Sequence, residues 1–330
     1  MLSGFDIPVV LIIFKRTDTV LRIIERLREV RPQKIYIISD AGRNDSENIM
    51  VENCRQEIEN SINWDCEIIK NYATTNRGVH AQIGLGARWV FEREETAIFL
   101  EDDNLPEVTF FDYCKKCLLK YKDNEDIFWI CGTNYLQKCK PKNNASVFAS
   151  RHLMPCGWAS WSNKFLKYYD FNLELTDTVS WEKDLKKHYK DKRLYKQQLR
   201  SISGELKRKE LNQRYASWDF HTVLSIRMRD LYGIVPKYNQ IENIGVDEFS
   251  THGGNSMEIE MTRRFCGIKS FPLSESIILP SASELDFSFE KDIGKIILYP
   301  LKARIILHLR DLFKVKEGVR LRDALLHKNA

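Results

Sequence analysis

Three consecutive carboxylates follow an apolar segment and are the strongest chemical signal in the sequence. Glu101, Asp102 and Asp103 come directly after Ala97–Leu100, which is typical of a buried strand. Carboxylates this close together repel one another, so we expect either a bound cation or nearby hydrogen-bond donors to offset the repulsion. Oxygen ligands of this kind suit Mg²⁺ or Mn²⁺, with phosphate oxygens completing the coordination shell. The alternative is an acidic turn at the edge of a sheet.

Further polar residues follow two other predicted strands. Asp40 ends the strand predicted at 34–39, and Asn76, Arg77 and Gly78 precede a helical segment. Arg77 can pair with a diphosphate, and Gly78 permits close backbone approach at a helix N-terminus. The alternative for Arg77 is a solvated loop residue. Because ligands bind at the carboxyl ends of parallel strands, we expect these residues to gather on one side of a sheet with the acidic triplet.

Strand and helix patterns alternate through the first part of the chain and would position these residues. Strands are predicted at 8–14, 34–39, 66–70, 97–100 and 127–131, and helices at 17–31, 47–59, 78–94 and from 106 onward. This order predicts an α/β fold with a mostly parallel sheet flanked by helices. The regularity then fails, and the later segments are predicted as a loop at 136–165, helices to about 214, a helix from Ser217, a strand at 233–235 and a loop at 239–256.

Composition excludes several classes of protein. Apolar residues make up 43% of the chain, and the low counts of 15 Gly and 9 Pro exclude collagen-like and disordered chains. No apolar run approaches the ~20 residues of a membrane span, and Met1–Asp6 lacks the features of a signal peptide. We therefore expect a cytoplasmic protein whose eight cysteines are reduced. Cys114 and Cys117 form a CxxC pair that we interpret as helix packing rather than a zinc site.

A series of short motifs resembles the GT-A glycosyltransferases. The likeness is greatest to bacterial family-two-like enzymes and to the N-acetylglucosaminyltransferase I group, whose DxD motif has a Glu-Asp-Asp version. It spans residues 7–255 and is carried, in order, by PVVLIIFKR, IYIISDAG, NRGVHAQIGLGARWVFE, IFLEDD, CGWASW, SWD and NIG…TH. The resemblance implies a nucleotide-binding half at 1–135, an acceptor-side half at 136–290 and a C-terminal extension at 291–330.

The resemblance also implies roles for individual residues near the metal. Asp103 would bind the Mn²⁺ or Mg²⁺ that bridges the nucleotide diphosphate, while Asp102 and Glu101 would lie by the ribose and the donor sugar. His252 matches a late histidine that often completes the metal shell, with an ordinary loop histidine as the alternative.

On the nucleotide side, the resemblance implies that Asp40 reads the base edge and that Phe14 and Arg16 border the nucleotide. The residues Asn76, Arg77 and Gly78 belong to the same predicted binding site.

Aromatic residues in two later motifs suggest an acceptor-binding surface. The rings of Trp158, Trp161 and Trp218 could stack on sugar faces, whereas the alternative for Trp158 and Trp161 is core packing.

An inverting transfer needs one carboxylate to take the proton of the acceptor hydroxyl. We expect Ser217 to cap a helix and Asp219 to lie in its first turn, where the resemblance places the base. The alternative is ordinary helix-dipole chemistry at Asp219. Asp247 and Glu248 are the reserve candidates.

The predicted function is therefore an inverting, metal-dependent glycosyltransferase. It would move a sugar from a nucleotide-diphosphate sugar to a saccharide or lipid-linked saccharide in surface glycan synthesis. We expect the donor to be a UDP-sugar. The first alternative is a sugar-phosphate nucleotidyltransferase, but such enzymes have a glycine-rich segment after the first strand, where this chain has Phe14-Lys15-Arg16-Thr17-Asp18. The second alternative is a non-catalytic module that binds an anionic ligand. No nucleic-acid-binding pattern is present, and we expect no nucleic-acid partner.

Positive charge gathers in two segments. Residues 181–214 hold twelve Lys or Arg against five Asp or Glu, and residues 291–330 hold ten against four. Both suggest anionic partners, with solvated helical faces as the alternative. In the second segment apolar residues recur at helical spacing beside basic ones: Ile305, Ile306, Leu309, Leu312 and Phe313 with Lys302, Arg310 and Lys314. This pattern predicts a helix that lies on the anionic inner face of a membrane, with packing on the body or against a second subunit as the alternative.

Overall fold

The computed structural model describes residues 4–141, 144–246, 256–274, 276–281, 285–313 and 315. The elements of the first half are β1 (Val9–Ile13), α1 (Thr17–Val30), β2 (Lys34–Ser39), α2 (Asp45–Ser61), β3 (Glu67–Tyr72), α3 (Val79–Phe91), β4 (Thr96–Glu101), β5 (Asn104–Pro106), α4 (Thr109–Lys120) and β6 (Ile127–Cys131). The remaining elements are β7 (Val147–Ser150), β8 (Trp158–Trp161), α5 (Ser162–Tyr168), the 3₁₀ turn Glu174–Thr176, α6 (Trp181–Lys187), α7 (Lys192–Glu210), α8 (Asp219–Met228), β9 (Tyr232–Pro236), β10 (Ile241–Asn243), α9 (Glu260–Phe265), α10 (Phe287–Ile297) and α11 (Leu301–Leu312).

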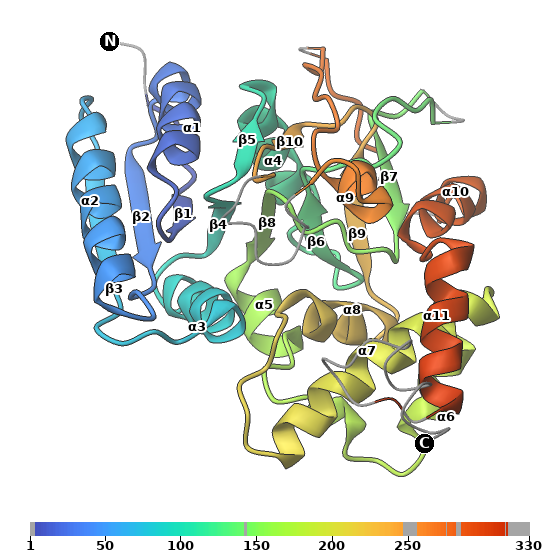
Figure 1. Cartoon of the computed structure of the whole chain (residues 1–330). Helices are drawn as coiled ribbons and strands as arrows, with labels where there is room; N and C mark the ends of the chain where they lie inside the picture. The colour runs from blue at the N-terminus through green and yellow to red at the C-terminus, as the bar shows by residue number, and fades with distance from the viewer. Residues whose placement is uncertain are drawn as a thin grey trace.

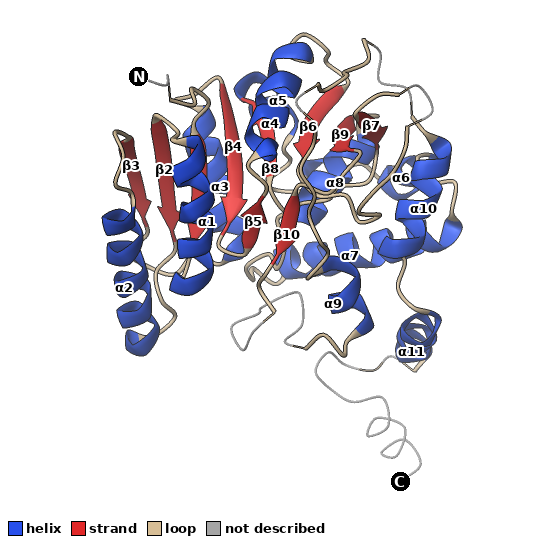
Figure 2. Cartoon of the chain, turned by 90° about the horizontal axis from the view of Figure 1, so that it is seen from above, coloured by secondary structure: helices blue, strands red, loops and turns tan. Residues whose placement is uncertain are grey.

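Eight strands form one sheet in the order β3-β2-β1-β4-β8-β6-β9-β7 (Figure 2). The strands β1 to β4 are parallel, and β6 is parallel to β9. By contrast, β8 runs antiparallel to both β4 and β6, and β7 runs antiparallel to β9. This confirms the predicted α/β fold with a mostly parallel sheet. The chain moves outward from β1 to β2 and β3 and then returns to the other side of β1 as β4, so the crossover direction reverses between β1 and β4. Ligands of open α/β sheets bind beyond the carboxyl ends of the strands at this point.

Helices cover both faces of the sheet. One core cluster contains Val20 of α1, Cys54 of α2 and Phe110 of α4, which pack against one face. The opposite face is covered by α3, α5, α8 and α10, whose Ile83, Phe165, Ile226 and Ile293 share the second cluster. The helices follow from apolar stripes: α1, for example, buries Val20, Ile23, Ile24 and Leu27. Cys114 and Cys117 are also buried in the first cluster, which confirms their predicted packing role.

Two segments predicted as loops contain strands. Within 136–165 the chain forms β7 and β8 and begins α5, and within 239–256 it forms β10. These strands are only three or four residues long, so their local pattern is weak. They exist because each pairs with a strand that is distant in sequence: β8 lies between β4 and β6, and β10 forms an antiparallel pair with β5.

The basic segments form helices away from α1 and α2. The segment 181–214 contains α6 and α7, which pack with α8 through a small cluster that includes Trp181, Leu185 and Ile202. Figure 1 shows α10 and α11 at the side of the molecule opposite α1 and α2. Arg200 of α7 holds α11 by donating to the Leu307 carbonyl at 3.2 Å. Within the described residues, none of the helices combines the length and apolar character needed to cross a bilayer.

Candidate active site

The acidic triplet lies where the crossover direction reverses. β4 is an apolar strand paired with β1, and Glu101 is its last residue. Asp102 and Asp103 form the turn that follows. Arg16, from the connection after β1, places Nη1 3.3 Å from Asp102 Oδ1 and 3.5 Å from Asp103 Oδ2. Its Nη2 donates to the Gly245 carbonyl at 3.2 Å. One guanidinium therefore joins the ends of both central strands to the segment after β10.

The triplet carries more negative charge than Arg16 offsets. Burial, together with Asp103 and Asp102, raises the pKa of Glu101 well above its usual range. Burial and the neighbouring Asp103 raise the pKa of Asp102 to about 7, although Arg16 acts in the opposite direction. The pKa of Asp103 is also raised, chiefly by burial. A cation from outside the protein would stabilise the ionised form of these groups.

The triplet fits a metal that is shared with a ligand. Within the described residues, no three His, Cys, Asp or Glu side chains are arranged to hold a metal ion by themselves. Mg²⁺ sites that include phosphate commonly use only one or two protein carboxylates, with the remaining positions taken by phosphate oxygens and water. Asp103, the predicted ligand, would supply the one protein carboxylate that such a shared site needs. His252 and the reserve candidates Asp247 and Glu248 lie outside the described residues.

The turn after β4 is fixed by residues that the sequence analysis did not select. Asn104 is 1% exposed, and its Oδ1 accepts from the backbone N–H groups of Glu101 at 3.3 Å and Gly157 at 2.7 Å. Its Nδ2 donates to Asp103 Oδ1 at 2.5 Å. On the other side, a Cβ on Gly245 would lie 2.5 Å from Asp103 Oδ2. The sequence signals for these contacts were the position of Asn104 next to the triplet and that of Gly245 in the NIG motif, but β5 and β10 were not predicted.

Asp40 positions the loop before α3 rather than presenting a free carboxylate. Its oxygens accept from the backbone N–H groups of Ala41, Arg77 and Gly78 at 2.9, 2.8 and 2.9 Å. The Asn76 amide adds a fourth contact at 3.2 Å. Each oxygen thus accepts two hydrogen bonds, so Asp40 has a structural role in this loop, and its reading of a base edge stays a prediction.

The loop that Asp40 holds leads directly into α3. Gly78 precedes the helix with φ +83°, a conformation that favours glycine. Asn76 and Gly78 line the cavity described next, whereas the contact of Arg77 with Asp40 is made by its backbone N–H.

The site residues border a cavity of about 670 Å³. It brings together most of the predicted residues, namely Phe14, Arg16, Asp40, Asn76, Gly78, Glu101, Asp102, Asp103, Trp218 and Asp219. Near Phe14, Lys15 Nζ lies 5.6 Å from the ring centroid and forms an ion pair with Glu47 at 2.7 Å. Hydrogen bonds from Arg43 and Lys15 hold the pKa of Glu47 well below its usual range. This end of the cavity therefore offers an aromatic ring flanked by cations.

Asp219 is the first residue of α8 and lines the same cavity. Its Oδ1 accepts from the backbone N–H of Phe220 at 3.0 Å. Burial raises the pKa of Asp219 to about 6, and Asp219 in turn contributes to the raised pKa of Glu101. The two carboxylates therefore lie within electrostatic reach of each other. The predicted cap is wrong in detail, because Trp218 and not Ser217 occupies the N-cap position and no side chain caps the helix.

All three predicted acceptor-side tryptophans are buried in the core, and Trp218 also lines the cavity. Trp158 is 1% exposed and stacks between Phe99 and Trp129, with ring centroids 3.9 and 4.0 Å away. Trp161 is buried against the opposite face of the sheet, where its Nε1 donates to the Leu118 carbonyl. Their spacing of three residues on a strand directs them to opposite faces. The interpretation as a sugar platform is therefore corrected to core packing for both residues, whereas Trp218 lines the cavity.

The cavity wall also contains a buried polar network that the sequence did not reveal. Arg227 of α8 places Nη2 3.1 Å from His152 Nδ1, and its guanidinium lies over the Tyr189 ring at 4.5 Å. Glu290 of α10 places Oε2 3.8 Å from His152 Nε2. Burial and Arg227 lower the pKa of His152 to about 4. These residues come from distant segments, so only the tertiary structure brings them together.

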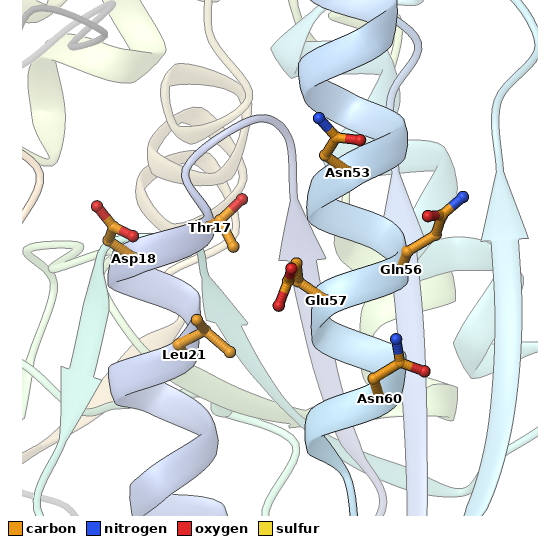
Figure 3. A pocket seen from close by; sticks show the side chains of 7 residues that line it. All are labelled: Thr17, Asp18, Leu21, Asn53, Gln56, Glu57 and Asn60. Atoms are coloured by element: carbon orange, nitrogen blue, oxygen red, sulfur yellow. The ribbon is translucent and has the colours of Figure 1, made fainter.

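A second hollow of about 600 Å³ lies between α1 and α2 (Figure 3). Its lining is mostly polar and includes Asp18, Asn53 and Gln56. It contains none of the site residues predicted from the sequence, and the cavity at the carboxyl ends of the strands remains the candidate active site.

Comparisons with known proteins give only distant likenesses. No protein-family model matches the chain, and no curated protein sequence is significantly similar to it. A cytidylyltransferase structure from Leptospira borgpetersenii has a TM-score of 0.32 and 9% identity, and the match covers 50% of this chain and 64% of that one. The match thus spans less than two thirds of that enzyme's length. UDP-glucose pyrophosphorylase is similar in its complex with UDP-glucose (TM-score 0.36, 11% identity, 72% of this chain and 94% of that one) and in its apo form (0.36, 10%, 72% and 93%). At this distance the likeness does not indicate a reaction.

Proposed function

We propose that this protein is a transferase that uses a nucleotide-diphosphate sugar and moves the sugar to a hydroxyl group of an acceptor. The observation that carries the proposal is a single cavity that contains the acidic triplet and, separately, Asp219 with a pKa raised to about 6. A carboxylate with this pKa is suited to accept a proton near neutral pH.

The nucleotide would bind at the end of the cavity that contains Phe14, Arg16 and the 76–78 loop. Lys15 and Arg43 carry two positive charges against the single negative charge of Glu47, which leaves positive charge there for a diphosphate. Asp103, together with phosphate oxygens of the donor, would hold Mn²⁺ or Mg²⁺, which supplies charge that stabilises the departing diphosphate.

Asp219 would act on the acceptor. As the acceptor oxygen attacks the anomeric carbon, the Asp219 carboxylate takes the hydroxyl proton and the diphosphate leaves with the bonding electron pair. This direct displacement inverts the anomeric configuration and needs no covalent intermediate. The acceptor would lie in the part of the cavity beyond Asp219, whose lining combines the apolar side chains Leu153, Leu194 and Phe265 with polar ones. A lining of both kinds would fit a saccharide, free or lipid-linked.

Sugar-phosphate nucleotidyl transfer is the second candidate, because an acidic triplet that shares a divalent cation with phosphate oxygens also suits that reaction. The site favours glycosyl transfer for two reasons. The connection after β1, Phe14–Lys15–Arg16, has no glycine with which to approach a triphosphate closely. In addition, a sugar phosphate attacks through an oxygen that is already ionised, so nucleotidyl transfer gives a carboxylate such as Asp219 no proton to accept.

The products distinguish the two reactions. The protein is incubated with UDP-glucose, UDP-galactose or UDP-N-acetylglucosamine and Mn²⁺, with and without pyrophosphate, and the nucleotides are separated by chromatography. Glycosyl transfer or slow donor hydrolysis produces UDP without pyrophosphate. Nucleotidyl transfer produces UTP and a sugar 1-phosphate only when pyrophosphate is present. Production of UTP would overturn the first candidate, and absence of both products with every donor would count against both.

A further inference from the structure

Gln82 is a buried polar side chain in the cavity wall whose amide has no partner. It lies on α3 and is only 3% exposed. Neither its Oε1 nor its Nε2 forms a hydrogen bond with any residue that the structure describes, although Gln82 lines the cavity. A buried amide without partners costs free energy in the folded state. A hydrophobic side chain of similar size would avoid this cost. We therefore expect the amide to bind a partner from outside the chain.

The packing of α3 fixes the position of this amide. At its N-terminus the backbone N–H of Gly78 is held by Asp40, and Gly78 accepts from the Gln82 backbone N–H at 2.9 Å. Further along, a Cβ on Gly84 would lie 2.9 Å from Tyr169 Oη, and one on Gly86 would lie 2.9 Å from Ile38 Cδ1. The helix therefore packs closely against its neighbours on two sides. Rotation of α3 to expose Gln82 to bulk water would disrupt both contacts, so Gln82 stays in the cavity wall.

The chemistry of the amide restricts what can bind it. An amide offers an acceptor oxygen beside a donor NH₂ group, so a complementary partner must both donate and accept. Phosphate oxygens and carboxylates only accept, which would leave Oε1 unpaired, and a metal ion would leave Nε2 unpaired. A pair of adjacent hydroxyl groups satisfies both atoms.

Gln82 shares its cavity with the predicted nucleotide side and with the acidic triplet. Gly78 lies one helical turn before it, on the predicted nucleotide side, and Glu101 ends β4 in the wall of the same cavity. We infer that Gln82 binds adjacent hydroxyl groups of the hexose carried by the nucleotide donor and so helps to select that sugar. This inference rests on the proposed use of a nucleotide sugar.

Thermal unfolding with two kinds of ligand tests the inference. Wild type, Gln82→Leu and Gln82→Met are unfolded alone, with UDP and Mn²⁺, and with UDP-glucose, UDP-galactose or UDP-N-acetylglucosamine and Mn²⁺. Both variants should have a higher Tm than wild type without ligand, because the unpaired amide is gone. Their Tm shift with UDP should equal that of wild type, whereas the additional shift that the sugar gives should be lost. In turnover, kcat/KM should fall about ten- to a hundredfold, as expected when two neutral hydrogen bonds are lost.

A matched control variant and the results that would overturn the inference complete the test of Gln82. Gln56→Leu changes an exposed glutamine of α2 in the other hollow (Figure 3) and should leave both ligand shifts unchanged. If Gln82→Leu and Gln82→Met keep the additional sugar shift, the amide binds only water and the inference is overturned. A lower Tm without ligand in both variants would show a structural role and would also overturn it. If wild type itself responds to no UDP compound, the proposed function fails first, and the assignment of Gln82 falls with it.

Discussion

At the scale of single residues, Asp219 connects the chemistry of the site to pH. Its pKa is raised to about 6, chiefly by burial. If Asp219 is the base, kcat/KM should rise with pH through about 6 and level off above it, because the ionised form is the reactive one. Asp219→Asn should lower kcat by ~10²–10⁴ and leave the affinity for UDP unchanged. Isothermal titration and steady-state kinetics measure the two quantities separately.

The same substitution has a predictable effect on stability. A raised carboxyl pKa means that the folded state binds the proton more tightly than the unfolded state, so the contribution of Asp219 to stability is present below pH 4 and lost as pH rises through about 6. Asp219→Asn should therefore raise the Tm relative to wild type at pH 8 but change it little at pH 4. Equal Tm differences at both pH values, or turnover within a few-fold of wild type, would leave Asp219 as a residue of the first helical turn and nothing more.

Asp103 is the residue on which the metal assignment rests. Asp103→Asn removes one charge from the triplet and should lower kcat by ~10²–10³, the equivalent of several kcal/mol of stabilisation of the departing charge. The variant should fold normally, because less carboxylate repulsion remains. EDTA should have the same effect on wild type, with recovery after Mn²⁺ is added. Full activity of wild type in EDTA would rule out the metal.

At the scale of elements, the segment after β10 holds the acidic turn in place. A Cβ on Gly245 would lie 2.5 Å from Asp103 Oδ2 and 2.7 Å from Asp103 Cβ. Gly245→Ala should therefore displace Asp103 and reduce activity by up to ~10²-fold, the usual effect of a displacement of about 1 Å at a reacting centre. Raising the Mn²⁺ concentration should restore part of this loss. The matched control is Gly204→Ala in α7, where a Cβ meets nothing within 4 Å and activity should not change.

Elements with a strong local pattern were predictable, and those made by distant pairing were not. The buried run of β2 and the stripe of α1 are visible in the sequence, and β2 was predicted with its observed bounds, Lys34–Ser39. The sequence also predicted that Asp40, the 76–78 loop and the acidic triplet would lie on one side of the sheet, and residues of all three line the cavity. By contrast, β8 and β10 depend on partners far away in the chain, and so do the contacts of Asn104 and Gly245 with Asp103. Trp158 and Trp161 were assigned wrongly for the same reason. A loop was predicted at these residues, whereas they lie in β8, which directs their rings into the core.

At the scale of the whole molecule, α11 presents an apolar face that the described part of the chain does not cover. Leu301, Ile305 and Leu312 are 63%, 50% and 65% exposed, and their spacing places them on one face of the helix. Exposed Lys302 lies beside them. The residues just before α11, Ile297 and Tyr299, line the cavity of the candidate active site. A membrane bound at α11 would therefore lie near that cavity.

Vesicle flotation measures this interaction. We expect wild type to float with vesicles of anionic phosphatidylglycerol and to remain behind with neutral phosphatidylcholine, since each basic residue near an anionic surface contributes about 1 kcal/mol. Ile305→Ser with Leu312→Ser should abolish flotation while leaving the Tm unchanged, because both side chains are exposed. If wild type fails to float and the double variant instead changes the sedimentation of the protein, α11 binds a second subunit.

The position of β8 has a consequence for how the protein folds during synthesis. Ala159 pairs with Ile98 of β4 on one side and with Ile130 of β6 on the other, so β8 separates two strands that precede it in the chain. Until the ribosome has released residues 158–161, the apolar edges of β4 and β6 have no correct partner. Unpaired edges of this kind invite pairing with other chains, and closing long loops is slow. The nascent chain should therefore depend on chaperones for longer than the regular alternation of its first strands and helices suggests.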